Sequence, residues 1–260
     1  MKAAPPLFSV AASFALLALL VLPVGALLLR ALAPAALGTL LTPGAAEALR
    51  LSLLTTLTSV SLTVLFGTPV AHLLARYRFR GRRVLDALVD LPVVLPPVVA
   101  GVALLLVFGR RGLIGGPLSD LGLDLAFTTT AVVLAQLFVA SPFYVRALKA
   151  GFRGVPPELE EAALTDGAGR WGAFWFVTWP LTRGAFIEGA VLAWARALGE
   201  FGATIVFAGS LEGRTRTLPL AVYAALERDL DAALALSGVL TVAALGLFVV
   251  FRAVVRRDPA

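Results

Sequence analysis

The sequence predicts an all-α protein that crosses a membrane six times, as a single transmembrane domain over residues 1–260. Of its residues, 59% are hydrophobic and 15% are charged, whereas a typical soluble domain has about 25% charged residues. The mean hydropathy is +0.92. The apolar residues gather in segments of about 20 or more, the length that a helix needs to cross a hydrocarbon core of ~30 Å. Lipid is therefore the solvent expected around most of the chain.

The six apolar segments lie near residues 7–29, 51–75, 84–108, 127–148, 184–208 and 232–255. The first of them has a second interpretation, a cleaved signal peptide, because Lys2 precedes it and small residues stand at positions 31 and 33. The apolar core of a signal peptide has only ~7–15 residues, and this segment is longer. We therefore expect it to remain as the first span.

The second, third and fourth segments contain prolines, which remove helix hydrogen bonds and bend a helix. We expect breaks at residues 67–69 and 141–142, and in the third segment, where Asp90 is followed by Pro92, Pro96 and Pro97. Membrane helices tolerate such breaks where neighbours or water satisfy the freed carbonyl groups. The run from 90 to 97 is therefore a candidate wall of a pathway through the membrane, and a purely structural kink is the alternative.

The fifth segment carries the ionisable residues Glu188, Arg196 and Glu200. A charge at the centre of a membrane helix costs about 2.5–3.5 kcal/mol on insertion scales, so it usually faces a partner or water. Arg196 and Glu200 are four residues apart and can pair on one helix face. Two interpretations stay open: an ion pair that locks helix packing, or a polar stripe that lines a pathway or gate, for which Phe201 and Thr204 are further candidates. Because two carboxylates outweigh one guanidinium, we do not expect Arg196 to bind an anion by itself.

Residues 149–183 form the longest polar segment. A helix is expected over 156–166, because proline suits a first helical turn and glutamates at 158, 160 and 161 follow near the positive end of the helix dipole. Gly167 is a natural left-handed stop. One face of this helix holds small and apolar side chains, those of Leu159, Ala162 and Ala163.

A second short helix is expected over residues 169–178. It would carry Trp171, Trp175 and Trp179 at a spacing of four residues, and so on one face. Tryptophan is enriched at membrane–water boundaries. This row is therefore expected at the edge of the membrane.

The spacing within this loop resembles the EAA loop of ABC importer permeases: Glu-Ala-Ala, three residues, Gly, nine residues, an aliphatic residue, a spacer, an apolar residue and Pro. The matching positions are Glu161, Ala162, Ala163, Gly167, Val177 and Pro180, with Trp179 where the pattern more often has Leu. The resemblance implies a type I importer bundle and a cytoplasmic helix that docks into a groove on a separate ATP-hydrolysing subunit. The docking residues that it implies are Glu158, Leu159, Glu161, Ala162, Ala163, Asp166 and Gly167. An ordinary exposed surface helix is the alternative.

No Gly-x-x-x-x-Gly-Lys-[Ser/Thr] phosphate loop occurs in the sequence. ATP and Mg²⁺ are therefore expected on the partner subunit, with no cofactor on this chain and no enzymatic activity of its own. The absence of Cys and the presence of a single His, His72, exclude thiol catalysis, disulfides and a multi-His metal site. A membrane-embedded enzyme and a passive channel are the competing classes, and the enzyme lacks an obvious set of catalytic groups.

Three further segments, at 141–146, 195–204 and 216–223, resemble the permease subunit of molybdate ABC importers, to which tungstate and sulfate or thiosulfate permeases are closely related. The resemblance implies import of an oxyanion, molybdate before the others. It also implies a permease homodimer, two ATP-binding cassette subunits, and an extracytoplasmic oxyanion-binding protein that discriminates among cargoes. The expected location is a bacterial or archaeal cell membrane.

The distribution of Lys and Arg predicts that both termini lie in the cytoplasm, because cytoplasmic loops carry an excess of these residues. With that orientation the cytoplasmic ends hold about twice as many as the outer ends, and the 149–183 loop is cytoplasmic. The cytoplasmic set is Lys2, Arg76, Arg78, Arg80, Arg82, Arg83, Arg146, Lys149, Arg153, Arg170, Arg183, Arg252, Arg256 and Arg257. The outer set is Arg30, Arg50, Arg110, Arg111, Arg214, Arg216 and Arg228. The net charge of +6 reflects this loop placement and not a nucleic-acid partner.

Overall fold

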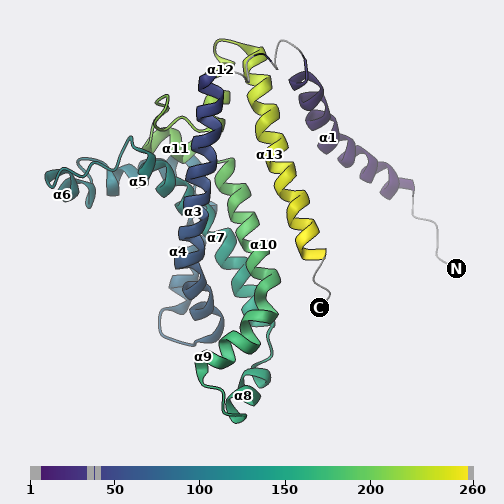
Figure 1. Ribbon diagram of the computed structural model, residues 1–260, viewed down its shortest axis with the longest axis vertical. Coiled ribbons are helices and arrows are strands. Elements are labelled where there is room, and N and C mark those ends of the chain that lie inside the picture. The colour runs from purple at the N-terminus through teal and green to yellow at the C-terminus, as the bar shows by residue number, and fades with distance from the viewer. Residues whose placement is uncertain (1–6, 34–37, 39–41, 257–260) are drawn as a thin grey trace.

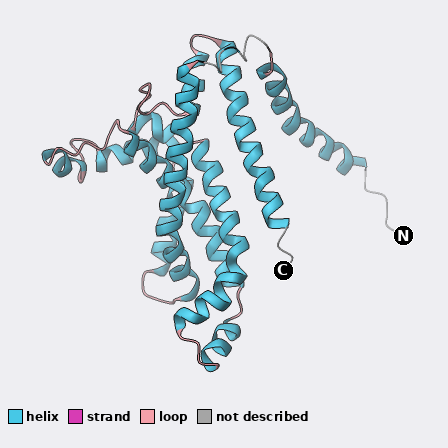
Figure 2. Cartoon of the chain, viewed as in Figure 1, coloured by secondary structure: helices cyan, strands magenta, loops and turns pink. Residues whose placement is uncertain are grey.

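The computed structural model describes residues 7–33, 38 and 42–256, and this part of the chain consists of helices and loops without a strand (Figure 2). Lys2 and Arg257, which enter the count of basic residues, lie outside the described residues. The all-α prediction is confirmed. The helices run along one long axis, with an arm that leaves the bundle sideways (Figure 1).

The first apolar segment forms α1, Leu7–Ala31, which lies at one side of the bundle and diverges from it towards the N-terminus (Figure 1). Its main neighbour is α13, Leu230–Arg256. Ala31, at its C-terminal end, is buried, whereas Phe14 and Leu22 are exposed. Thus α1 is anchored near one end and leaves most of its apolar surface uncovered by its own chain.

Three long helices form the centre of the bundle: α3, Pro43–Arg76; α7, Thr129–Gly154; and α10, Trp179–Leu198. They meet at the buried ring of Tyr144. A Cβ atom at Gly67 of α3 would lie 2.9 Å from this ring, and one at Gly189 of α10 would lie 3.1 Å from it, so both glycines permit the close approach. The Tyr144 hydroxyl is 2.7 Å from the Thr68 hydroxyl. A side chain larger than hydrogen at either glycine would force the three helices apart.

A row of buried hydroxyl residues on α3 adds hydrogen bonds between helices. Ser52 accepts a bond of 2.7 Å from the backbone N–H of Leu218, the first residue of α12, Leu218–Leu226. Thr56 accepts one of 2.9 Å from the indole N–H of Trp194. In a membrane, where water does not compete at depth, such bonds between helices hold neighbouring helices together.

The expected breaks at 67–69 and 141–142 are wrong, because α3 and α7 continue through Pro69 and Pro142. A proline removes the hydrogen bond to the carbonyl four residues earlier. In α7 that carbonyl belongs to Phe138, and the Ser141 hydroxyl lies 3.5 Å from it and donates to it. At this distance an O–H···O bond is weak, so the packing of α3, α7 and α10 against one another is what keeps both helices continuous through their prolines.

The third segment forms two helices, α4, Arg82–Val94, and α5, Pro97–Phe108, whose axes differ by 118°. The segment expected as one continuous span over 84–108 is therefore bent at residues 95–96, and whether the two helices together cross the membrane stays a prediction. Leu95 and Pro96 have extended backbone, with ψ of 132° and 136°, because a residue that precedes proline is excluded from the helical region. The chain then leaves the bundle along α5 towards α6, Gly115–Asp120 (Figure 1). Pro92 lies within α4 and does not end it.

The fifth segment begins earlier than expected and is interrupted. The short helix expected over 169–178 is the first part of one helical stretch, in which α9, Arg170–Ala173, and the π-helix η1, Phe174–Thr178, lead directly into α10. Helical structure stops at Gly199 and resumes as α11, Gly202–Phe207. The span expected over 184–208 is thus a long helix and a short one.

Among the described residues, α1, α3 and α7 are long and apolar enough to cross a membrane, and a bent α4–α5 span would be a fourth. The helix α10 carries Arg183, Glu188 and Arg196. The described apolar stretch of α13 is Leu230–Gly246. The six apolar segments support six spans. Among the described helices, three pass the length and composition test, or four with the bent pair, so the number six stays a prediction.

Candidate functional site

Within the polar segment 149–183, whose two ends belong to α7 and to the stretch from α9 to α10, a short helix lies at one end of the bundle: α8, Pro157–Thr165 (Figure 1). It begins at a proline, as expected, and it ends in a Schellman motif. Gly167 has φ of +90°; its N–H bonds to the Leu164 carbonyl at 3.1 Å, and the Ala168 N–H bonds to the Ala163 carbonyl at 2.9 Å. This pairing satisfies the carbonyl groups that a helix end would leave unbonded.

The residues expected to dock are accessible. All of α8 is described, and it has no buried residue. The exposed members of the expected set are Glu158, Leu159, Glu161, Ala162, Asp166 and Gly167, and Ala163 is half-buried. Leu159 is 45% exposed. An apolar side chain beside two alanines on an accessible helix gives a face on which another protein can pack.

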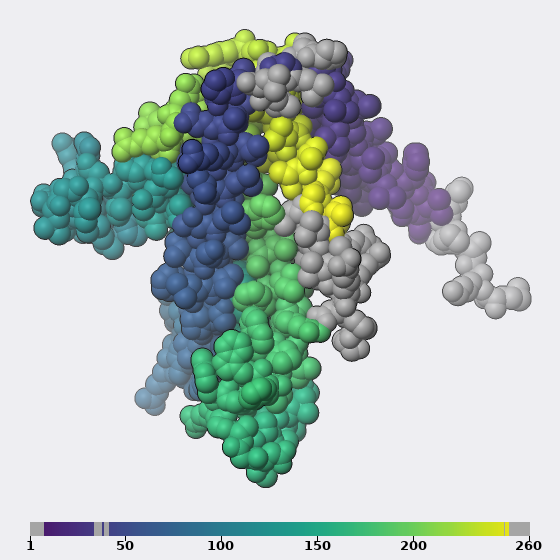
Figure 3. Space-filling model, in the orientation of Figure 1, coloured from purple at the N-terminus to yellow at the C-terminus, as the bar shows by residue number. Residues whose placement is uncertain are grey.

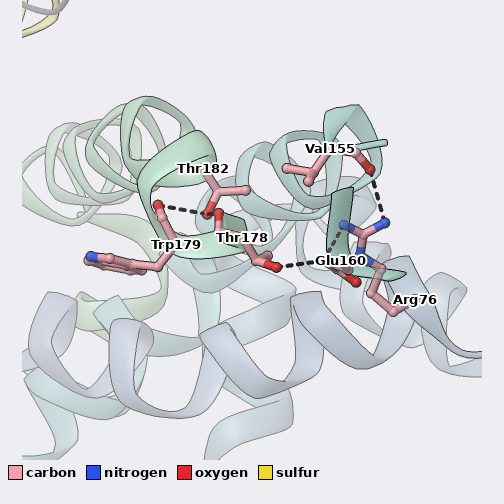
Figure 4. A network of polar contacts seen from close by, with 6 residues as sticks. All are labelled: Arg76, Val155, Glu160, Thr178, Trp179 and Thr182. Carbon is pink, nitrogen blue, oxygen red and sulfur yellow. Dashed lines mark hydrogen bonds and ion pairs between the residues drawn. The ribbon is translucent and has the colours of Figure 1, made fainter. Parts of the chain in front are cut away.

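Glu160, which was not among the expected docking residues, faces the bundle instead (Figure 4). Its Oε1 atom lies 2.6 Å from Nη2 of Arg76 and accepts a hydrogen bond of 2.5 Å from the Thr178 hydroxyl. Nη1 of Arg76 donates to the Val155 carbonyl at 3.1 Å. We call Arg76, Glu160, Thr178 and the Val155 carbonyl the Glu160 clamp. The clamp joins the last residue of α3, the end of α7, α8 and the last residue of η1.

The expected tryptophan row is present on the helical stretch that follows α8. The ring centres of Trp171 and Trp175 are 6.1 Å apart, and those of Trp175 and Trp179 are 5.8 Å apart. Between this row and α3 lies a cavity of about 800 Å³, which Arg76 and Glu160 also line. The π-helical turn η1 lies within the row. Such turns are rare in proteins, and those that occur are often at functional sites.

The pathway candidates on α4 and α5 have two different roles in the structure. Asp90 pairs with Arg146 of α7, with Oδ1 2.5 Å from Nε, and Asp86 pairs with Lys149. These pairs hold α4 against α7. Pro96 and Pro97 form the sharp bend, and the sequence pattern located that bend correctly.

The bend at Pro97 touches the interruption between α10 and α11. A Cβ atom at Gly202, the first residue of α11, would lie 2.6 Å from Cβ of Pro97. The absence of a side chain at Gly202 therefore lets the two interruptions meet. No proline marks the stop at 199–201, and the signal that could have located it is glycine: Gly199 caps α10 and Gly202 opens α11.

Glu200 stabilises this junction. It is buried, with Oε2 2.7 Å from Nη2 of Arg196. Its Oε1 accepts a hydrogen bond of 2.8 Å from the backbone N–H of Ala203 in the first turn of α11. The pair between Arg196 and Glu200 is thus present, and its contacts favour the locking interpretation.

The other residues of the fifth segment divide between core and surface. The Phe201 ring packs on Tyr223, with ring centres 5.1 Å apart. Thr204 is fully buried, and its hydroxyl has no hydrogen-bond partner within the described part of the chain. Glu188 is exposed on α10 and forms no ion pair with any described residue. A continuous stripe from Glu188 to Glu200 is therefore not assembled within this chain.

An apolar helical bundle with an accessible helix clamped to one end is the architecture of a membrane protein that can bind a partner at that end. The chain belongs to the family described as "Binding-protein-dependent transport system inner membrane component", which matches residues 63–257. It is a permease subunit of an ABC importer. Subunits of this family form the path of the transported solute and are not enzymes.

Relatives with curated descriptions are also permease proteins of transport systems. The chain is 51% identical over 203 residues to the molybdenum transport system permease protein ModB of Mycobacterium bovis, covering 78% of this chain and 77% of the relative. It is 41% identical over 198 residues to the sulfate transport system permease protein CysW of Synechococcus elongatus, covering 74% and 69%. Its fold is similar to a chain of a bacterial ABC transporter that imports alginate, with a TM-score of 0.72, 19% identity, and coverage of 98% and 96%.

Proposed function

We propose that this permease carries molybdate into the cytoplasm, driven by a separate ATPase subunit. The observation that carries the choice of cargo is that molybdenum permeases of several bacteria match at 41–51% identity, against 41% to a sulfate permease over a similar length. Tungstate and sulfate or thiosulfate remain the alternative cargoes, because these oxyanions share charge and shape.

The helix α8 is the proposed docking element for the ATPase subunit. Support comes from its exposure and from the flat face of Leu159 and Ala162. ATP and Mg²⁺ would bind to that subunit, since the chain lacks a phosphate-binding loop. Two ATPase subunits would serve a permease homodimer, one on each α8.

The permease is proposed to act as a homodimer that receives its cargo from an oxyanion-binding protein on the outer side. The uncovered faces of α1 are consistent with a second permease (Figure 3). The end of the bundle opposite α8 would then face the binding protein. The family itself is described as binding-protein-dependent.

The proposed mechanism is alternating access. Closure of the ATPase subunits would move α8, and the bundle would transmit that movement to the contact between Pro97 and Gly202. The two states must differ in their contact energies with the ATPase, because a ligand shifts an equilibrium only through its different affinities for the two states. Glu200 and Arg196 would hold one side of the contact.

Uptake by reconstituted proteoliposomes tests this proposal. They would contain the permease, its ATPase subunit and the binding protein, with labelled molybdate outside and competing tungstate or sulfate. We expect ATP-dependent accumulation of molybdate that excess sulfate does not abolish. Equal competition by sulfate would contradict the proposed cargo, and flux without ATP would indicate a passive channel.

A further inference from the structure

Three glutamates lie within four residues on α8, and the structure separates them. Glu158 and Glu161 are exposed. The side chain of Glu160 is only 26% exposed, and a single oxygen of its carboxylate receives both the Arg76 guanidinium and the Thr178 hydroxyl. Charge-assisted hydrogen bonds of this kind are shorter and stronger than bonds between neutral groups. Glu160 is therefore bonded in a way that its neighbours are not.

Arg76 extends the clamp beyond this carboxylate. Its side chain is 14% exposed, so little water competes for the ion pair. It is the last residue of α3, and its second terminal nitrogen bonds to Val155, which caps the C-terminal end of α7. One side chain thus holds the ends of the two longest core helices and α8.

Thr178 carries the connection into α10. It is buried, it is the last residue of the π-helix η1, and its carbonyl accepts a hydrogen bond of 2.8 Å from the Thr182 hydroxyl one turn further on (Figure 4). Beyond Thr182 the same helix leads to Arg196. The clamp therefore lies at the start of the helix that ends at the Pro97–Gly202 contact.

The hydrophobic attachment of α8 is weak in comparison. Leu159 and Leu164, its two leucines, are 45% and 43% exposed. Since apolar burial stabilises roughly in proportion to the area removed from water, these residues do little to fix α8 on the bundle. The polar clamp fixes its position.

From these contacts we infer that Glu160 couples the movement of α8 to the bundle. As a positioning residue, it makes α8, the inner end of α3 and the start of α10 move as one rigid unit. The inference rests on the proposed docking of an ATPase at α8. In it the exposed face of α8 binds the partner, and the inward Glu160 passes the displacement to the bundle. Loss of the clamp should leave the partner bound and able to hydrolyse ATP, but less cargo should be transported for each ATP hydrolysed.

The test uses the reconstituted complex with Glu160→Gln, which keeps an oxygen for Thr178 and removes the charge that binds Arg76. We expect about a five-fold fall in molybdate transported per ATP hydrolysed, with the ATPase subunit still purifying in the wild-type ratio. Asp120→Asn, the same change at an exposed carboxylate of α6, is the control and should behave as wild type. Thr178→Val, which removes one of the two donors, should give an intermediate loss even if Glu160→Gln does not assemble.

A second readout separates force transmission from a merely structural role. Because the chain has no cysteine, spin labels can be placed at Thr165→Cys on α8 and Arg80→Cys beyond α3. The distance between them should stay constant through the ATP cycle in the wild type and broaden in Glu160→Gln. A wild-type distance that changes with nucleotide, or unchanged transport per ATP in both clamp variants, would overturn the inference. A wild type that binds no ATPase would instead overturn the proposed function.

Discussion

At the scale of single residues, burial decides how much the loss of an ion-pair partner lowers the stability of the fold. The pair of Arg196 and Glu200 has a counterpart of equal spacing, Glu212 and Arg216, in the segment between α11 and α12. The carboxylate of Glu200 is 1% exposed, whereas the Glu212 side chain is 74% exposed. A buried charge that loses its partner is costly, and an exposed pair contributes little. The two pairs therefore form a matched comparison within one chain.

We expect Glu200→Ala to lower the free energy of unfolding by about 3 kcal/mol, the lower end of the range for breaking a buried pair, because Arg196 retains some access to water. The change also removes the acceptor of the Ala203 N–H. Glu212→Ala should cost about 0–1 kcal/mol. Denaturation in detergent, followed by tryptophan fluorescence, measures both. Equal losses would show that Glu200 does not lock the α10–α11 junction.

At the scale of elements, the end of α8 depends on the backbone of Gly167. Its φ of +90° is open to glycine, whereas a β-branched residue there is strained. Gly169 has a negative φ of −66°, and a Cβ atom at this position would have no neighbouring atom within 4 Å. These two glycines, two residues apart, differ in the sign of φ: only Gly167 has the left-handed backbone that a β-branched residue cannot adopt without strain.

Gly167→Val is expected to cost ~1–2 kcal/mol at the end of α8 and to reduce molybdate uptake several-fold, with membrane insertion unchanged. The reason is that the Schellman hydrogen bonds would no longer hold the docking face in place. Gly169→Val is the control and should transport normally. Uptake assays and membrane-fraction blots on both variants check this. Normal uptake by Gly167→Val would argue against docking at this loop.

The contact between the interrupted helices gives a second prediction at this scale. In Gly202→Ala the new Cβ would meet Pro97 at 2.6 Å, and overpacking of this kind costs typically about 1–3 kcal/mol. We expect a lower unfolding midpoint and slower uptake. Gly199→Ala, whose Cβ would meet its nearest atom at 3.7 Å, should have little effect. If both variants match the wild type, the contact is not needed for transport.

The sequence predicted the helices better than their interruptions. Apolar length was enough for α1, α3 and α7, because a long apolar run in lipid must satisfy its backbone as a helix. It misjudged Pro69 and Pro142, since the packing between α3, α7 and α10 that keeps both helices continuous exists only in the folded bundle. It also could not choose among the glutamates of α8. Arg76 and Glu160 are 84 residues apart, and which carboxylate meets Arg76 depends on how α8 packs.

At the scale of the whole molecule, the two ends of the bundle differ in composition. The segment between α3 and α4, residues 77–81, lies at the same end as α8 (Figure 1), and it contains Arg78 and Arg80. The opposite end carries α12 and its C-terminal cap, Glu227. A mechanism that couples α8 to a cytoplasmic ATPase needs the first end inside the cell, and the positive-inside rule independently favours that orientation.

We therefore expect a cysteine on α8, Thr165→Cys, to react with a membrane-impermeant thiol reagent only after cells are permeabilised, and Glu227→Cys to react in intact spheroplasts. Both positions are exposed, so protection can come only from the membrane or a bound partner. The parent chain has no thiol and gives the background. Co-expression of the ATPase subunit should then reduce labelling of Thr165→Cys in permeabilised cells but leave Glu227→Cys unchanged, because the partner would cover one end alone. Labelling of Thr165→Cys from outside would reverse the orientation, and with it the role of α8, since no ATP-hydrolysing subunit could reach it there.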